Sequence, residues 1–234
     1  MATVGRVAHV MRFPVKSMRG EELQQADVSF QGLRGDRVYA FVQTEKRGPF
    51  PWLTARELPE LVRFEPLWVE REGQPALDVR TPEGKVLPVE HEELLREVQE
   101  RAGRPARLHS DHRGNQDWAP VSIITTSTIR ALCEAAGVPE DYRRFRMNIV
   151  VETDLPPFAE AKWEGRTVRA GEVALAVTEQ DLRCVIITLD PDSSESTPPL
   201  LKAASDMNEA YAGVYASVVV AGKVSVGDEV VVEG

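Results

Sequence analysis

Short hydrophobic runs recur along the whole chain, separated by turns rich in glycine, proline and aspartate. Many of them alternate apolar with polar residues or are rich in β-branched side chains, which is typical of β-strands. They predict strands at residues 4–12, 38–43, 61–70, 106–109, 121–125, 144–151, 173–177, 183–189, 214–220 and 229–232. So many short strands at close spacing predict a barrel or a sandwich.

Apolar residues return at helical spacing in only three segments, which are residues 92–102, 128–136 and 200–211. Each segment is short and apolar on one side, as expected of a helix that covers a β-structure. The pattern therefore predicts an α+β protein that is mostly β, with a few covering helices.

The most polar and turn-rich stretch is residues 111–117. Clusters of aspartate, glycine and asparagine between periodic segments predict a loop. We place a boundary there, with an N-terminal β module at residues 1–110 and a C-terminal module at 111–234. A chain of 234 residues is long enough for two closely packed modules of this size.

Composition excludes several classes of protein. Hydrophobic residues make up 42% and charged residues 28%, as in ordinary globular proteins. No apolar run is long enough to cross a bilayer, and the N-terminus lacks the pattern of a signal peptide, so we expect a cytoplasmic protein without a membrane anchor. With 37 acidic and 28 basic side chains the net charge is −9, which disfavours nucleic-acid binding. An anionic ligand would need a local basic cluster.

Cys184 follows Arg183 and precedes a β-branched run that ends in an acidic turn, a setting typical of a metal or redox ligand. It could equally be a buried strand residue, and in a regular strand Arg183 would point to the opposite face. Cys133 falls on the apolar side of the predicted helix at 128–136, where free cysteines pack as small hydrophobes. Two thiols are too few for an iron–sulfur cluster, which needs about four, so any electrons must come from another protein.

Arg146 and Asn148 share one face of the predicted strand at 144–151. Two interpretations stay open for this pair. Arg146 could form an ion pair with a nearby carboxylate. Alternatively, the guanidinium and the amide could form a site for an anion such as phosphate.

Two short loops concentrate positive charge on this acidic chain. One contains Lys16 and Arg19, and the other contains Arg34 and Arg37. Arg19 and Arg34 fit solvated surface charges. Lys16 and Arg37 lie at strand edges, where a side chain is held in place, and they are the better candidates for binding an anion.

Hydroxyl side chains precede the predicted helix at 128–136, with Thr125, Ser127 and Thr128 as the candidates. They can cap free amides, and the same helix start can attract an anion, so both roles can coexist. His109 and His112 have a spacing that would suit zinc only with further ligands from elsewhere, and no other Cys or His cluster supplies them. No nucleotide-binding glycine motif is present.

Taken together, these segments resemble the MOSC family, named after the C-terminal domain of molybdenum cofactor sulfurases. The resemblance runs nearly end to end and is to the longer members, which have an N-terminal β-barrel module. Its motifs are Pro14-Val15-Lys16-Ser17, Gly32-Leu33-Arg34-Gly35-Asp36-Arg37, Thr54-Ala55-Arg56-Glu57-Leu58-Pro59-Glu60-Leu61, residues 146–151, Pro157-Phe158-Ala159-Glu160 with Trp163, Arg183-Cys184, Asp190-Pro191-Asp192 and residues 222–228. Several motifs in the right order are more specific than any one alone. Relatives include the mitochondrial amidoxime-reducing components and bacterial enzymes that reduce N-hydroxylated bases.

The resemblance implies a β-barrel-like MOSC core packed with the N-terminal module, and a molybdenum cofactor whose metal takes one protein thiolate. Cys184 matches that ligand, and a soft thiolate suits such a metal. By the same resemblance, cofactor-binding positions are Lys16, Ser17, Arg37, Thr125, Ser127, Thr128, Arg146, Asn148 and Arg183. Two residues depart from the pattern: Met147 replaces a frequent proline, and Met18 replaces a cysteine found in some relatives.

The resemblance further implies a molybdenum-dependent oxidoreductase, independent of pyridoxal phosphate, that reduces the N–O bond of small N-hydroxylated compounds. The chain lacks the ferredoxin-like domain of some bacterial relatives, so the electron donor would be a separate ferredoxin, flavoprotein or cytochrome. Two other functions stay open: sulfur transfer through a persulfide on Cys184, and carriage of the cofactor without turnover. A fold that has lost its cofactor is the remaining alternative.

Overall fold

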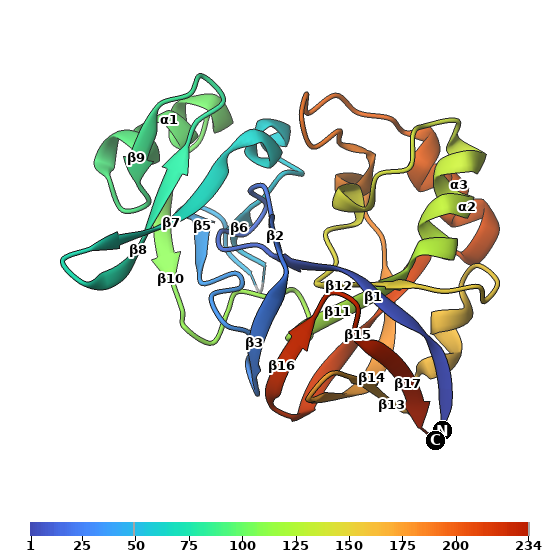
Figure 1. Cartoon of the computed structure of the whole chain (residues 1–234). Helices are drawn as coiled ribbons and strands as arrows, with labels where there is room; N and C mark the ends of the chain where they lie inside the picture. Colours follow the sequence, from blue (N-terminus) through green and yellow to red (C-terminus); the bar gives the residue numbers. More distant parts are fainter. Residues whose placement is uncertain (49, 234) are drawn as a thin grey trace.

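The structure is a computed structural model that describes residues 1–48 and 50–233. Its largest element is a barrel of seven strands in the order β12-β11-β15-β14-β13-β17-β1, closed because β1 also pairs with β12 (Figure 1). The strands are β1 (Ala2–Arg12), β11 (Val121–Thr125), β12 (Ile149–Glu152), β13 (Thr167–Ala170), β14 (Val173–Leu182), β15 (Tyr211–Val220) and β17 (Glu229–Glu233). Closure satisfies the hydrogen bonds of strands that would otherwise be edges. The short strand β2 (Glu21–Leu23) extends the sheet beyond β1.

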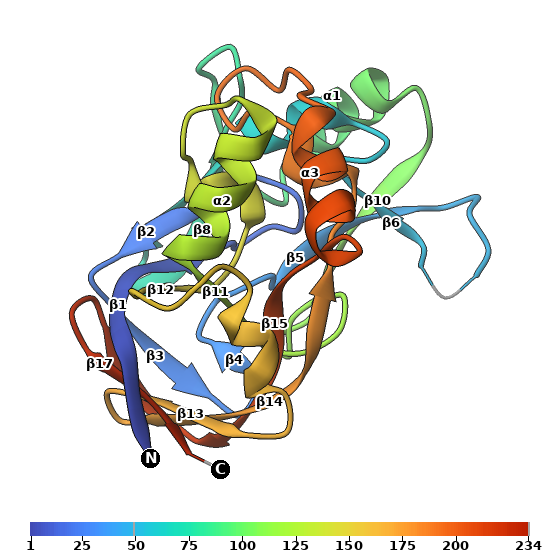
Figure 2. The ribbon, with the colours of Figure 1, turned by 90° about the vertical axis from the view of Figure 1, so that its right-hand side faces the viewer.

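The barrel interior is filled mainly by valine, with smaller numbers of alanine, leucine and isoleucine. All five residues of β11 are buried, because its outer face is also covered. The cover is formed by α2 (Thr126–Ala136) and α3 (Pro199–Asn208), which pack against each other (Figure 2). Ile124 on the outer face of β11 belongs to the same apolar cluster as Leu132 of α2 and Leu200 of α3.

The first part of the chain packs onto the last. β1 pairs with β17, so the two termini lie close together (Figure 2). β3 (Gln25–Ser29) pairs with β16 (Gly222–Ser225) on one side and with β4 (Gly32–Leu33) on the other. The predicted boundary between residues 110 and 111 stays a prediction.

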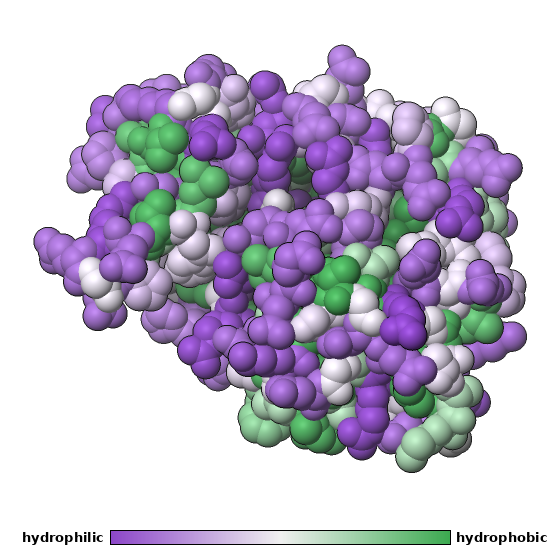
Figure 3. Space-filling model, in the orientation of Figure 1, coloured by the Kyte–Doolittle hydropathy of each residue, from purple (hydrophilic) through white to green (hydrophobic). Residues whose placement is uncertain are grey.

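The remaining N-terminal residues form a second body with two three-stranded sheets. One contains β5 (Tyr39–Gln43), β6 (Trp52–Leu53) and β10 (Ala106–Ser110), and the other contains β7 (Glu65–Arg71), β8 (Gln74–Arg80) and β9 (Val86–Pro88). Helix α1 (Glu92–Ala102) adds Leu94 and Val98 to their shared core. The face in Figure 3 is mainly hydrophilic and is hollowed between the two bodies. No helix within the described residues is long and apolar enough to span a membrane.

The predicted fold class is confirmed, since the chain is mostly β with three helices among its described residues. The helix at 92–102 has the predicted bounds, and α2 begins two residues before its predicted start. Helix α3 ends at Asn208 rather than at Tyr211. Glu209 and Ala210 have left-handed backbones that end the helix and turn the chain into β15.

Three predicted strands were wrong in whole or in part. Residues 183–189 contain the 3₁₀ turn η4 (Val185–Thr188). Residues 144–151 contain the end of η2 (Tyr142–Phe145), and β12 begins only at Ile149. Residues 61–70 begin in η1 (Pro59–Arg63) before β7 starts. Hydrophobic runs of this length suit buried turns as well as strands, because periodicity alone cannot separate them.

These turns change which side chains lie together. Asp141 accepts a hydrogen bond from the backbone N–H of Arg143 and so starts η2, and Arg146 then ends it in a left-handed conformation. The face shared by Arg146 and Asn148 in a regular strand is therefore absent. In a regular strand, Arg183 and Cys184 would point to opposite faces. They do not form part of a strand, because both residues follow the end of β14.

Candidate functional site

A cavity of about 520 Å³ lies between the barrel and the N-terminal body, and it brings together residues from distant parts of the chain. Lys16 and Ser17 come from the loop after β1, and Arg37 comes from the turn before β5. Of the predicted site residues, its walls contain Lys16, Ser17, Arg37, Arg146, Arg183 and Cys184.

Three of these residues have left-handed backbones, with φ of 68° at Ser17, 51° at Arg37 and 56° at Arg146. This conformation is uncommon for residues other than glycine, and it tends to occur where surrounding structure holds a functional side chain in place. Here it occurs at three separate turns around one cavity. Tertiary packing, and not local preference, therefore determines how these side chains are presented.

Cys184 is half-buried and directly precedes η4. Arg56 lies near it: burial lowers the pKa of Arg56, but the interaction with Cys184 and the charges of Asp117 and Glu57 together outweigh this effect and raise it. The thiolate is the form of cysteine that binds metals. Cys133 is 1% exposed in the core beneath α2, and burial raises the pKa of its thiol. The prediction that Cys133 packs as a small hydrophobe is confirmed.

Lys16 is almost fully buried, and its ammonium group faces a carboxylate. Lys16 Nζ donates hydrogen bonds to Asn115 O at 2.7 Å and to Asp117 Oδ1 at 2.6 Å. Burial lowers the pKa of Lys16, and Asp117 opposes this change only in part. The Lys16 ammonium therefore has an anionic partner already, although that partner is exposed at the cavity mouth.

Arg37 and Arg146 lie close together on the ring of Phe13, with their guanidinium carbons 4.9 and 4.5 Å from its centroid. Arg37 is paired with the buried carboxylate of Asp36. Arg146 forms no ion pair and donates no side-chain hydrogen bond within the described part of the chain. Burial, followed by the charge of Arg37, lowers the pKa of Arg146 to about 9. A bound anion would relieve both effects.

Arg183 is held in place by the core. It is paired with the buried carboxylate of Asp181, and its Nη2 donates to Phe145 O at 2.5 Å. Burial raises the pKa of Asp181, and the charge of Arg183 opposes that change. Among the described residues, Arg183 Nε is buried without a partner.

The donor set of this cavity fits a molybdenum–pterin cofactor. Five cationic side chains and three carboxylates line the walls, which leaves the cavity positive in a protein of net charge −9. The unpaired guanidinium of Arg146 suits a phosphate group. No group of three or more His, Cys, Asp or Glu side chains in residues 1–48 and 50–233 is arranged to hold a metal ion. In these walls, Cys184 would supply the thiolate that molybdenum takes.

Asn148 does not line this cavity. Its Oδ1 accepts hydrogen bonds from the backbone N–H and the hydroxyl of Ser122, and its Nδ2 donates to Met11 O. Arg37 Nη1 reaches the same Oδ1 at 3.4 Å. Asn148 therefore joins β1, β11 and the start of β12.

Thr125, Ser127 and Thr128 also lie outside the cavity. The hydroxyls of Thr125 and Thr128 each donate to Glu160 Oε2 at 2.9 Å, and Thr125 also caps α2. Glu160 is fully buried, and its Oε1 has no partner among the described residues. The structure thus gives the hydroxyls of Thr125 and Thr128 a carboxyl partner, and a cofactor role for all three residues stays a prediction.

Glu160→Gln should stabilise the protein at neutral pH by about 1–3 kcal/mol. Burial raises the pKa of Glu160 despite its bonds to the two hydroxyls. The folded carboxyl therefore keeps its proton at a pH where the unfolded one has lost it. Its contribution to stability is present below the unfolded pKa and is lost as the pH rises through the folded pKa. Glutamine cannot ionise, so the variant should lack this loss.

Urea unfolding between pH 4 and pH 8, measured as free energy, tests this prediction, with Glu134→Gln on the exposed face of α2 as the control. A lower stability of Glu160→Gln at neutral pH would mean that an ionised carboxylate is the form stabilised by Thr125 and Thr128.

Several residues of the cavity escaped sequence reasoning. Arg56 belongs to a motif on which the family resemblance rests, so its position could have been found there. Asp117 lies at the end of the polar stretch that we interpreted as a boundary loop. Trp118 is 70% exposed beside it, and Tyr215 lies within the regular pattern of β15, where no sequence signal distinguishes it.

Comparison with known proteins agrees with this architecture. Residues 109–231 match the MOSC domain, and residues 4–119 match the MOSC N-terminal beta barrel domain. No curated protein matches the sequence. Among solved structures, the YuaD protein from Bacillus subtilis has a TM-score of 0.55 and 14% identity, over 98% of this chain and 95% of that one. YiiM from Geobacillus stearothermophilus has 17% identity and a TM-score of 0.40, over 50% of this chain and 55% of its own. At such identity, the likeness to YuaD shows a shared fold alone.

Proposed function

Because the chain belongs to the MOSC domain family, we propose that it binds the molybdenum cofactor and reduces the N–O bond of small N-hydroxylated compounds. The observation that carries the proposal is the cavity in which the half-buried thiol of Cys184 lies with an unpaired Arg146 guanidinium. A metal that takes a thiolate and an organic part that bears a phosphate would use these two groups together.

Each residue has a defined task in this proposal. Cys184 ligates the metal as a thiolate, and Arg56 stabilises that negative charge. Arg146 binds the phosphate, and Lys16 and Arg37 contribute positive charge from the loops after β1 and before β5. Arg183 adds a further positive charge to the wall next to Cys184. When bound, the cofactor would supply the two-electron redox chemistry.

The reaction needs an external source of electrons. Reduction of an N–OH group to N–H consumes two electrons and two protons and releases water. The described residues offer no redox group other than the two cysteines, so a separate ferredoxin, flavoprotein or cytochrome would supply the electrons. The use of a separate electron donor of one of these classes is part of the proposal.

The test is the molybdenum and pterin content of protein purified from a host that makes the cofactor. Wild type should contain molybdenum close to one per chain, Cys184→Ser should lose it, and Cys133→Ser should retain it because that thiol is buried in the core. Loaded wild type should then convert benzamidoxime to benzamidine with reduced methyl viologen as the donor.

Two results would overturn the proposal. Wild type without molybdenum would remove its basis and favour sulfur transfer, which predicts a persulfide on Cys184 after incubation with a sulfur donor. Molybdenum at full content without turnover of any N-hydroxylated substrate would instead favour a cofactor carrier.

A further inference from the structure

The walls of the Cys184 cavity contain aromatic side chains to which the proposed function gives no role. Five of the 20 lining residues are aromatic, although aromatic residues make up only 6% of the chain. They are Phe50, Trp118, Phe145, Tyr211 and Tyr215. Small-molecule sites combine apolar walls with a few polar groups that orient the ligand. The charged side chains assigned above supply only the polar groups, so the aromatic walls indicate a ligand with an apolar part.

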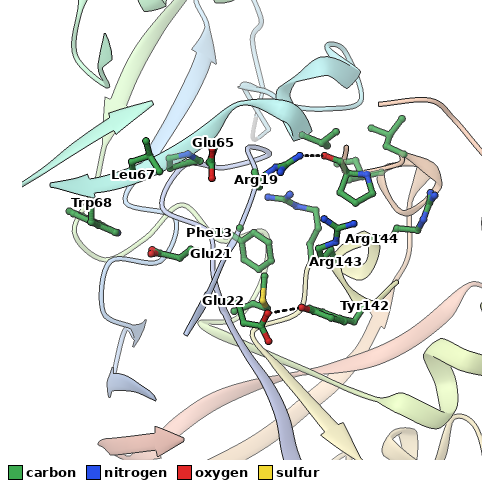
Figure 4. A pocket seen from close by; sticks show the side chains of 18 residues that line it. Phe13, Arg19, Glu21, Glu22, Glu65, Leu67, Trp68, Tyr142, Arg143 and Arg144 are labelled. Carbon is green, nitrogen blue, oxygen red and sulfur yellow. Dashed lines mark hydrogen bonds between the residues drawn. The ribbon is translucent and has the colours of Figure 1, made fainter. Parts of the chain in front are cut away.

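Trp118 differs from the other three tryptophans because its ring is free. Trp163 is 4% exposed within the barrel core. Trp52 packs against a histidine ring, with the two centroids 5.8 Å apart. Trp68 lines a second cavity (Figure 4), and the guanidinium carbon of Arg12 lies 5.3 Å from its ring centroid. Among the described residues, the ring of Trp118 has no stacked aromatic or cationic partner, and 70% of the residue is exposed. Its indole face is therefore available to a ligand.

The exposure of Trp118 does not come from a loose loop. Asn115 is 4% exposed, and its side-chain amide donates to two backbone carbonyls at 2.8 and 3.0 Å. Asp117 accepts a hydrogen bond from Lys16 Nζ at 2.6 Å, and Ala119 is 8% exposed. The residues on both sides of Trp118 are therefore held in place. A ligand that stacks on its ring has little backbone left to order.

Leu182 adds a second exposed apolar side chain to the same cavity. It is the last residue of β14, 60% of it is exposed, and it directly precedes Arg183 and Cys184. Trp118 comes from the loop before β11. A substrate whose N–OH group reaches Cys184 can contact these two apolar side chains with its remaining part. A flat aromatic body would bury the most apolar surface against them.

We propose that Trp118 is a specificity-determining residue, and that the site selects N-hydroxylated compounds with a flat aromatic body. The body stacks on the indole ring of Trp118 and contacts Leu182, while the N–OH group points toward Cys184. This inference rests on the proposed function, because it concerns the substrates of the same site.

The test compares 2-naphthamidoxime with acetamidoxime, which has the same amidoxime group but no ring. Binding to the full chain from a cofactor-producing host is measured by isothermal titration calorimetry, without an electron donor so that no turnover occurs. Trp118→Ala should weaken binding of 2-naphthamidoxime about tenfold and that of acetamidoxime less than about twofold. Trp118→Phe keeps an aromatic ring, and its affinity for 2-naphthamidoxime should stay within about threefold of wild type.

Phe30→Ala is the matched control. Phe30 is an aromatic residue of similar exposure, 69%, in the turn between β3 and β4, and it lines neither cavity. Its replacement should leave both affinities unchanged. With reduced methyl viologen as the donor, Trp118→Ala should raise KM for 2-naphthamidoxime about tenfold and leave kcat unchanged, because stacking stabilises the bound substrate and the transition state equally.

Three results would overturn this inference: wild-type affinity of Trp118→Ala for 2-naphthamidoxime, an equal loss of affinity for both amidoximes, or a loss in Trp118→Phe as large as that in Trp118→Ala. Absence of molybdenum or of turnover in wild type would overturn the proposed function instead. The affinities need neither electrons nor turnover, so they decide the role of Trp118 in either case.

Discussion

Gly5→Ala should destabilise the protein by about 3–5 kcal/mol, because the new methyl group would collide with the backbone at the seam that closes the barrel. Gly5 has φ of +156°, and a Cβ placed there would lie 2.0 Å from the carbonyl oxygen of Glu152. That oxygen belongs to β12, whose pairing with β1 begins at Arg6. It can retreat only if the two strands separate, so the barrel has to open locally.

The matched control is Gly84→Ala in the turn between β8 and β9. Gly84 also has a positive φ, of +90°, but a Cβ there would meet no atom within 4 Å. The control should show the cost of backbone strain alone, about 1–2 kcal/mol. Urea unfolding followed by tryptophan fluorescence compares the two variants. An equal loss of unfolding free energy in both variants would contradict this prediction, because it would show that the collision at Gly5 adds nothing to the cost of backbone strain.

Asp36→Ala should cost about 3–5 kcal/mol, because it leaves a buried cation without its partner. Asp36 is 3% exposed, its Oδ1 accepts a hydrogen bond from Phe13 N at 2.7 Å, and its carboxylate pairs with Arg37. Burial lowers the pKa of Arg37, and Asp36 outweighs that effect and raises it. Without Asp36, its negative charge would no longer offset the repulsion between the guanidinium groups of Arg37 and Arg146 over the ring of Phe13.

One further variant separates the charge of Asp36 from its hydrogen bond, and another serves as an exposed control. Asp36→Asn keeps an acceptor for Phe13 N but removes the charge, so its loss should be intermediate. Asp206→Ala removes an exposed pair with Lys202 on α3, and it should change the unfolding free energy by less than about 0.5 kcal/mol. Urea unfolding midpoints at low salt measure all three variants. If Asp36→Ala behaves like Asp206→Ala, then the Asp36–Arg37 pair does not hold this cavity together.

The local sequence pattern was sufficient to predict those elements whose structure depends mainly on their own residues. The helix at 92–102 has acidic residues in its first turn and ends at Gly103, a residue that readily adopts the left-handed conformation required there. Strand β11 is a short β-branched run that was found with its observed bounds. The apolar runs that contain η2 and η4 were wrongly predicted as strands. A side-chain hydrogen bond such as that of Asp141 favours a turn, and it does not change the hydrophobic pattern of the sequence.

The sequence by itself determined the mostly-β class, the family motifs and the candidate roles of residues such as Lys16 and Cys184. Only the tertiary structure decided which of these residues meet. The pairing of Lys16 with Asp117 spans 101 positions, and the closure of the barrel joins β1 to β12. The contact of Arg56 with Cys184 and the burial of Glu160 with two hydroxyls are equally non-local. Periodicity and propensity depend on near neighbours along the chain, whereas such contacts depend on how separate elements pack.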